Sequence, residues 1–180
     1  ETIGSEALDL PETELRTQAL YYTVPADVER EMRELACEAG RGDAGFNGGI
    51  HAAEHGSISL MPLDLLCDRA DIGGVSTPFH PHTEQSTVFI YDGHPGGVGL
   101  TRESYRDADR LLARTARLIA GCDCADGCPA CVQSPHCGNA NEPLSKPEAV
   151  TLLNALAGTD EPVPDPAGTP STNDGGAGER

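Results

Sequence analysis

The sequence predicts a mixed α/β fold (α+β), with a small sheet packed by helices and a tetracysteine zinc knuckle between two C-terminal helices. Three observations lead to this prediction: apolar segments with strand composition, longer segments with apolar residues at helical spacing, and five cysteines within sixteen residues. The chain of 180 residues is long enough for one compact domain with flanking segments.

The N-terminal half is predicted to begin with a strand and to continue with two helices. Residues 18–25 mix β-branched and aromatic residues and end at a proline, which is typical of a strand. Residues 25–39 begin at that proline and repeat apolar residues at helical spacing. The glycine-rich segment 40–49 predicts a turn. The helix after it is expected to run to about Met61, where Pro62 breaks or restarts it.

The C-terminal half is predicted to contain one more strand and two more helices. The short apolar run 87–92 predicts a buried strand, and residues 93–99 connect it to a helix at about 101–120. A last helix is predicted at 145–157, where Ser145 occupies the N-cap position. The five clustered cysteines lie between these two helices.

These elements suggest a domain at residues 17–157, preceded by a linker or edge segment at 1–16. Residues 158–180 are rich in Pro and Gly and acidic, with no apolar period, and are predicted to form a disordered tail. The chain opens with Glu1 instead of Met, so we expect it to be a piece of a longer polypeptide.

The composition limits the classes of partner. The formal net charge of -17 makes the chain a poor general binder of nucleic acid, so a DNA contact must come from a local basic patch. We expect no membrane partner, because no apolar run is long enough for a membrane span and no signal peptide is present. Dense clustering of the cysteines is typical of a metal site and not of disulfides, which favours a reducing cytoplasm.

The cysteine cluster has the spacing C-x-C-x3-C-x2-C-x5-C and predicts one structural zinc ion. The favoured ligand set is Cys122, Cys124, Cys128 and Cys131, with Cys137 as the spare. A set in which Cys137 replaces Cys122 is the competing assignment. An iron–sulfur cluster also uses four thiolates, and free thiols are a further alternative. With four thiolate ligands and no open position, the metal would hold the loop between two helices and would not activate water.

The segment His51-Ala-Ala-Glu54-His55 matches the H-x-x-E-H motif of inverzincin metalloproteases. On a helix, the two imidazoles lie one turn apart on one face, and Glu54 could serve as a general base. A zinc metallopeptidase-like hydrolase is therefore an alternative function. The third zinc ligand of such enzymes, a glutamate on a later helix, has no clear counterpart here. A partly buried polar cluster that hydrogen-bonds neighbouring loops is favoured over a second zinc site.

Two features could contact DNA phosphates. Gly96 and Gly97 lie in a strand-to-helix loop of the kind whose backbone amides can cradle a phosphate, although a tight turn is the favoured interpretation. A basic stripe recurs at helical spacing on the predicted helix 101–120, and it consists of Arg102, Arg106, Arg110, Arg114 and Arg117. Nearby acidic residues make a solvated, salt-bridged helix face the alternative.

Four segments in the same order resemble one family: residues 48–55, 67–74, 89–100 and 122–153. The sequence is similar to the C-terminal zinc-binding domain of MrfA/Hrq-type DNA helicases, which are DEAD/DEAH-box motors of superfamily two. The resemblance implies a tetracysteine site at Cys122, Cys124, Cys128 and Cys131. It also implies preceding RecA-like and winged-helix domains, and ATP-dependent 3′-to-5′ unwinding in DNA repair.

The chain itself carries no motor motif. Its single lysine, Lys146, lies outside any G-x-x-x-x-G-K-[ST] pattern, and no DEAD or DEAH tetrad is present. We therefore expect a non-catalytic accessory domain that supports DNA engagement or strand separation, binds DNA weakly alone, and contacts the RecA-like and winged-helix domains of its parent helicase. A protein-docking module is a further alternative. Two zinc ions per chain would favour the hydrolase.

Overall fold

The computed structural model describes residues 13–164. Residues 1–12 of the predicted linker and residues 165–180 of the predicted tail lie outside the described residues. The elements in chain order are β1 (Ala19–Thr23), α1 (Ala26–Glu38), α2 (Gly42–Leu65), a 3-10 turn η1 (Arg69–Asp71), β2 (Ile72–His80), β3 (Gln85–Asp92), α3 (Leu100–Arg106), α4 (Ala108–Ala120) and α5 (Lys146–Ala157).

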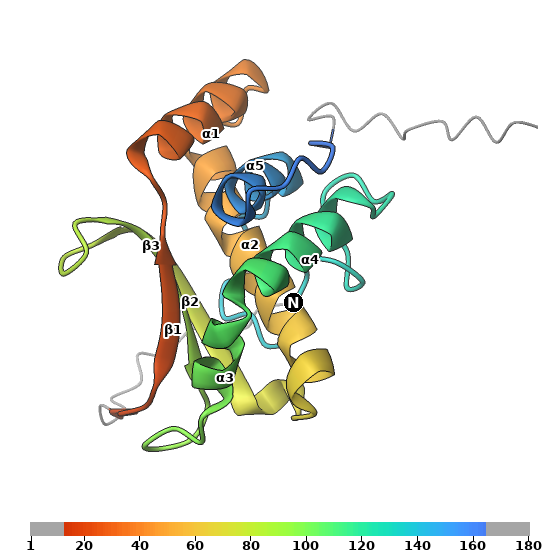
Figure 1. Ribbon diagram of the computed structural model, residues 1–180. Helices are drawn as coiled ribbons and strands as arrows, with labels where there is room; N and C mark the ends of the chain where they lie inside the picture. The colour runs from red at the N-terminus through yellow and green to blue at the C-terminus, as the bar shows by residue number, and fades with distance from the viewer. Residues whose placement is uncertain (1–12, 165–180) are drawn as a thin grey trace, which may run out of the picture.

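The three strands form an antiparallel sheet in the order β1-β3-β2, and helices cover one face of it (Figure 1). The central strand β3 pairs Ile90 with Leu20 of β1 and Asp92 with Ile72 of β2. Val88 and Ile90 are fully buried beneath the helices. The predicted mixed fold, with a small sheet and a cysteine cluster before the last helix, is confirmed.

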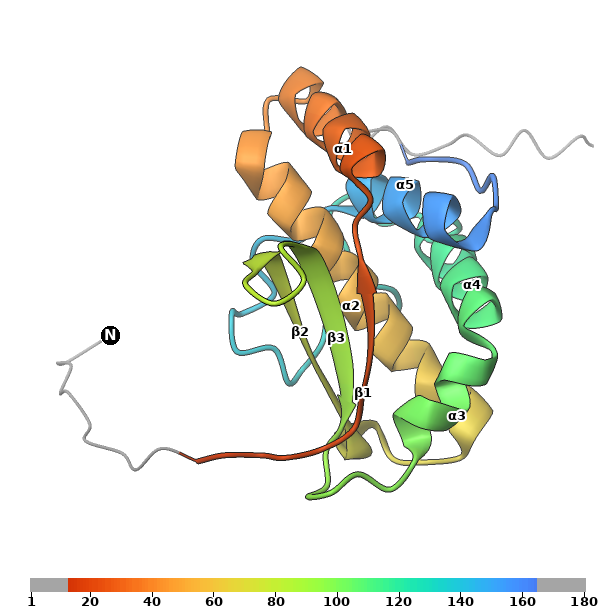
Figure 2. The same ribbon diagram turned by 60° about the vertical axis from the view of Figure 1, so that its left-hand side comes forward.

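Helix α2 is the central element of the core and runs between the sheet and helices α4 and α5 (Figures 1 and 2). It begins at Gly42, so the predicted turn at 40–49 is wrong for most of its length. Most glycines of this segment are part of the helix, and their lack of a side chain lets α1 and α5 pack directly against it. A Cβ atom on Gly49 would lie 2.5 Å from the Cβ of Glu148, and one on Gly48 would lie 2.8 Å from the carbonyl carbon of Leu144.

The structure differs from the sequence prediction at three further elements. Helix α2 continues through Pro62 to Leu65 and ends where Leu66 adopts a left-handed conformation. Strand β2 was not predicted, because its paired glycines and Pro78 are unusual in a strand. The predicted helix 101–120 is two helices, α3 and α4, separated at Asp107, which leaves helical geometry (φ -119°, ψ 33°).

Helix α5 agrees with its prediction within one residue. Ser145 is the N-cap residue, but its hydroxyl donates to the buried carboxylate of Glu148 and caps no backbone amide. That carboxylate also accepts a 2.6 Å bond from Arg41, which joins the start of α5 to the start of α2. None of the helices among residues 13–164 combines the length and apolarity needed to cross a membrane.

Candidate metal centre

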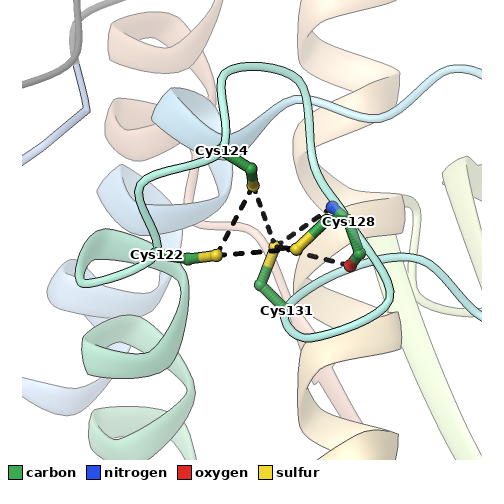
Figure 3. A group of neighbouring side chains, drawn as sticks. All are labelled: Cys122, Cys124, Cys128 and Cys131. Atoms are coloured by element: carbon green, nitrogen blue, oxygen red, sulfur yellow. Dashed lines mark hydrogen bonds between the residues drawn. The ribbon is translucent and has the colours of Figure 1, made fainter.

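Four cysteine thiols converge in the loop between α4 and α5 (Figure 3). Cys122 and Cys124 follow the end of α4, and the next turn returns Cys128 and Cys131 to face them. The sulfur atoms of neighbouring pairs lie 3.4 to 3.8 Å apart. Four sulfurs bound to zinc at about 2.3 Å in a tetrahedron would be about 3.8 Å apart. The four thiols therefore fit a closed tetrahedral zinc site, which is the ligand set that the spacing favours.

The local backbone supports thiolates in this loop. The backbone N–H of Cys128 donates to the sulfur of Cys131 at 3.3 Å. A hydrogen bond from the backbone of Ala130 lowers the pKa of Cys128 to about 7, whereas burial raises the pKa of Cys131. Gly127 turns the chain with φ +102°, and a Cβ there would lie 2.5 Å from a methyl carbon of Val132. Only glycine fits this corner of the knuckle.

Lys146 is a part of the centre that the sequence analysis overlooked. Its side chain is buried, and its ammonium group donates to the carbonyl oxygens of Cys122 and Cys124, the latter at 2.7 Å. The first residue of α5 therefore holds the first two ligands in place, and its positive charge lies near thiolates that carry negative charge when metal is bound. The sequence did contain an indication of this role, because Lys146 is the only lysine of the chain and follows the cysteine cluster closely.

The fifth cysteine of the cluster lies elsewhere. Cys137 is outside the group formed by the other four, and its sulfur is 3.5 Å from Nε2 of His51. The structure therefore does not bring together the competing ligand set that includes Cys137. It places Cys137 with His51 and His55, and the candidate ligand atoms of these three residues lie within 4.8 Å of one another.

Both histidines of the H-x-x-E-H segment are buried and hydrogen-bonded to the loop that follows the tetracysteine group. Nδ1 of His51 donates to the carbonyl of Pro143 at 2.8 Å, and Nδ1 of His55 donates to that of Val132 at 2.7 Å. Burial lowers the pKa of His55 to about 4, so its ring is neutral at pH 7. The rings pack edge to face with centroids 4.3 Å apart.

Glu54 lies in the same region but is not a member of this metal-ligand group. Burial raises the pKa of its carboxyl, which accepts hydrogen bonds from Ser76 of β2. In the peptidase alternative, the third ligand would be a glutamate on a later helix, whereas the third candidate ligand here is the thiol of Cys137.

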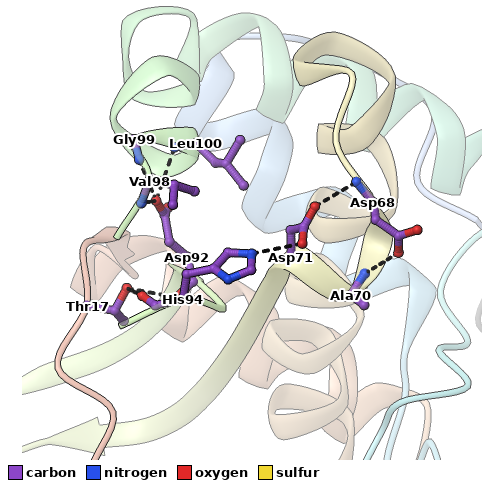
Figure 4. A network of polar contacts seen from close by, with 9 residues as sticks. All are labelled: Thr17, Asp68, Ala70, Asp71, Asp92, His94, Val98, Gly99 and Leu100. Carbon is purple, nitrogen blue, oxygen red and sulfur yellow. Dashed lines mark hydrogen bonds and ion pairs between the residues drawn. The ribbon is translucent and has the colours of Figure 1, made fainter. Parts of the chain in front are cut away.

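In the loop predicted to bind a phosphate, backbone amides at the start of α3 already donate to a side chain of the protein (Figure 4). The carboxylate of Asp92 accepts the backbone N–H groups of four successive residues at 2.7 to 3.1 Å, namely Val98, Gly99, Leu100 and Thr101. The amide of Gly96 donates to the carbonyl of Arg16, and that of Gly97 donates to the carbonyl of His94. These amides face carbonyl groups of the chain, which favours the tight-turn interpretation over a phosphate cradle.

The five arginines of the basic stripe are divided between α3 and α4, and three of them pair with carboxylates. Arg106 pairs with Glu103, Arg114 with Asp64, and Arg117 with Glu161. Arg102 and Arg110 are exposed, and neither forms an ion pair with any residue in the described part of the chain. Tyr105, on α3 before the break at Asp107, is 69% exposed.

Comparison with known proteins places this centre in a family. Residues 53–132, from the H-x-x-E-H helix to just past the fourth ligand, match the model of the MrfA Zn-binding domain. The protein MJ1572.1 of Methanocaldococcus jannaschii is 39% identical over 110 residues, which cover 59% of this chain and 98% of that protein. The chain belongs to the MrfA zinc-binding domain family.

Two further relatives are much longer, and this chain spans less than a fifth of their length. The ATP-dependent helicase YprA of Bacillus subtilis is 33% identical over 136 residues, which are 73% of this chain and 16% of the helicase. The ATP-dependent helicase HRQ1 of Saccharomyces cerevisiae is 29% identical over 63% of this chain and 12% of its own length. A crystal structure of the DUF1998 helicase MrfA bound to DNA superposes with a TM-score of 0.54 and 28% identity, over 87% of this chain and 19% of the helicase.

The chain belongs to a zinc-binding family, and its four converging thiols form a group that can hold a metal ion. The thiol spacing, the amide donated to Cys131 and the buried ammonium of Lys146 all fit a tetrathiolate zinc ion. Because no position remains open among four sulfurs, the ion would cross-link the chain without activating water.

Proposed function

We propose that the chain is a non-catalytic accessory domain of an ATP-dependent DNA helicase and helps the motor to engage DNA or separate its strands. The observation that carries this proposal is the superposition of 87% of the chain on one part of a DNA-bound MrfA helicase. Unwinding in the 3′-to-5′ direction, a role in DNA repair and a cytoplasmic location belong to the same proposal.

In this proposal, the zinc centre supplies rigidity. The metal joins the end of α4 to the start of α5, and α5 packs against α1, α2 and α4. Lys146 adds a second connection between α5 and the ligand loop. Helix α4, fixed at its C-terminal end in this way, can keep its exposed side chains at defined positions relative to a bound strand.

The side chains best placed to contact phosphates are Arg102 on α3 and Arg110 on α4. Both are exposed and lack the carboxylate partners that their three neighbours in the stripe have within the described residues. The net charge of -17 repels DNA, so the chain alone should bind weakly and only at low salt. Within a helicase, the motor would hold the strand close enough for two arginines to add affinity.

The test replaces Arg102 and Arg110 with Gln in a full-length helicase that carries this chain. DNA affinity should fall, and the slope of log affinity against log salt should decrease by up to about two, because each lost phosphate contact removes about one released counterion. ATP hydrolysis in the absence of DNA should be unchanged. Stability should change by no more than about 1 kcal/mol, since exposed charges contribute little.

Arg30→Gln is the matched control, because Arg30 is an exposed arginine of α1, at the end of the molecule opposite α3 (Figures 1 and 2). It should leave DNA affinity and salt slope unchanged. A double variant that binds and unwinds DNA like the unmodified helicase at every salt concentration would refute the arginine contact.

A further inference from the structure

We propose that His51, His55 and Cys137 form a second metal site for a zinc-class divalent ion, separate from the tetracysteine centre and with one coordination position open to a cavity. The site brings together helix α2 and the loop between the tetracysteine group and α5, which are more than eighty residues apart along the chain. Two imidazoles and one thiolate are a ligand type that zinc prefers.

The distances between the candidate ligands suit tetrahedral coordination. With typical Zn–N and Zn–S bond lengths, a nitrogen and a sulfur on the same ion lie about 3.6 Å apart. Nε2 of His51 and Sγ of Cys137 are 3.5 Å apart. The ligand atoms of all three residues lie within 4.8 Å of one another, so a single ion can reach each of them after small side-chain adjustments.

Both imidazoles are oriented as metal ligands usually are. A histidine ligand commonly donates its second ring N–H to a carbonyl or carboxylate, which fixes the ring and its tautomer. Here Nδ1 of His51 is held by the carbonyl of Pro143, and Nδ1 of His55 by that of Val132. With Nδ1 as the donor on each ring, Nε2 carries the lone pair that a metal needs.

The sulfur of Cys137 is held in place by two backbone hydrogen bonds. It accepts the backbone N–H groups of Asn139 at 3.4 Å and Asn141 at 3.3 Å. The loop is held in this shape by Asn141, whose side chain bonds both the amide and the carbonyl of Ser134. Amide-to-sulfur bonds of the same kind occur in the tetracysteine knuckle of this protein, where Cys128 donates to Cys131.

The three ligands line a cavity of about 400 Å³ between α2, β2 and the loop. Glu54, Arg69 and Ser134 share its wall. Figure 2 shows this loop, drawn in cyan, beside β2. Three protein ligands beside a cavity leave the fourth position for water or a small anion. Arg69, which donates to Ser134, supplies positive charge near that position. A second ion here would not by itself indicate the hydrolase, because the third candidate ligand is the thiol of Cys137 and not a glutamate on a later helix; peptide cleavage is not part of this proposal.

The test titrates Co²⁺ into the full chain after its tetracysteine centre has been filled with one equivalent of Zn²⁺. Co²⁺ displaces thiolate-bound Zn²⁺ poorly, so it reports on the remaining site. We expect one further equivalent to bind, with the visible bands of a tetrahedral thiolate-ligated Co²⁺. Azide should shift those bands, because the fourth position exchanges; bands unmoved by azide would refute the open position.

Variants separate the two sites. Cys137→Ser and His55→Gln should each lose the second equivalent and keep the first zinc ion, with circular dichroism showing an intact fold. Cys37→Ser and His82→Gln, at residues outside both groups, should keep both equivalents.

A second readout does not need a variant. Zn²⁺ in excess of one equivalent should slow alkylation of Cys137 in the unmodified chain while exposed Cys37 reacts at the same rate. The proposal is overturned if the chain takes up only one ion, if Cys137→Ser still takes up two, or if alkylation of Cys137 is unaffected by zinc.

Discussion

At the scale of single residues, the carboxylate of Asp92 binds backbone amides of the loop that the sequence suggested for a DNA phosphate. Asp92 occupies the anion position at the start of α3 and accepts four backbone amides. Burial by itself would raise the pKa of Asp92, but hydrogen bonds from Thr101, Val98 and Gly99 lower it below its ordinary value of 3.8. The carboxylate is therefore charged at neutral pH and fastens α3 to the end of β3.

Asp92→Asn should lower the free energy of unfolding by about 3 kcal/mol, because it removes a buried charge that satisfies several amides. The folded-state pKa is depressed, so the stabilisation is complete above the unfolded pKa and is lost only as pH falls through the folded value. The deficit should accordingly be constant between about pH 6 and pH 8 in urea unfolding. Asp109→Asn, at an exposed site on α4, should be nearly neutral; equal losses for the two variants would contradict this role of Asp92.

Lys146 is the second residue whose role is specific to its position. Lys146→Met keeps the side-chain volume but leaves the carbonyls of Cys122 and Cys124 without their donor. We expect zinc affinity to fall by about 10- to 100-fold, as is typical when a group that orients metal ligands is lost. Competition with a chromophoric chelator measures this directly. Arg30→Met should leave zinc affinity unchanged. An unchanged zinc affinity in Lys146→Met would show that Lys146 is not needed to position Cys122 and Cys124.

At the scale of elements, α2 is built for close approach of its neighbours. Gly49→Ala should favour the isolated helix by about 1 kcal/mol, since alanine has the higher helix propensity. In the protein, the new Cβ would lie 2.5 Å from the Cβ of Glu148 on α5. We expect overpacking to dominate and the net stability to fall by about 1–3 kcal/mol. Ser59→Ala, at an exposed position of the same helix, is the control and should differ little from the original chain in thermal unfolding. A stabilised Gly49→Ala would mean that α5 can move away freely.

At the scale of the whole molecule, we expect zinc to couple the last two helices to the core. Removing it with a strong chelator should unfold α5 and expose the apolar face of α2, because metal binding at such a site is part of the folding free energy. Cys128→Ser should aggregate or lose secondary structure by circular dichroism, whereas Cys137→Ser should remain folded. A soluble and well-folded chain lacking both Cys128 and Cys131 would contradict a structural role for the metal.

The sequence by itself determined the features that depend on short-range pattern. Strand β1, helices α1 and α5, and the spacing of the four zinc thiols were predictable, because local propensity and the geometry of a knuckle fix them within a few residues. The family resemblance came from the same local motifs.

The tertiary structure alone decided the features that depend on contacts between distant residues. The glycines of α2 lie in a helix whose close contacts with α1 and α5 leave no room for a Cβ atom. Strand β2 forms because β3 supplies its hydrogen-bonding partners. Cys137 joins the histidines of α2 and not the other cysteines, because the loop after Cys131 crosses to that helix. Bringing such distant residues together costs conformational entropy, and the packing and hydrogen bonds of the complete fold offset that cost. A local sequence pattern therefore cannot predict these contacts.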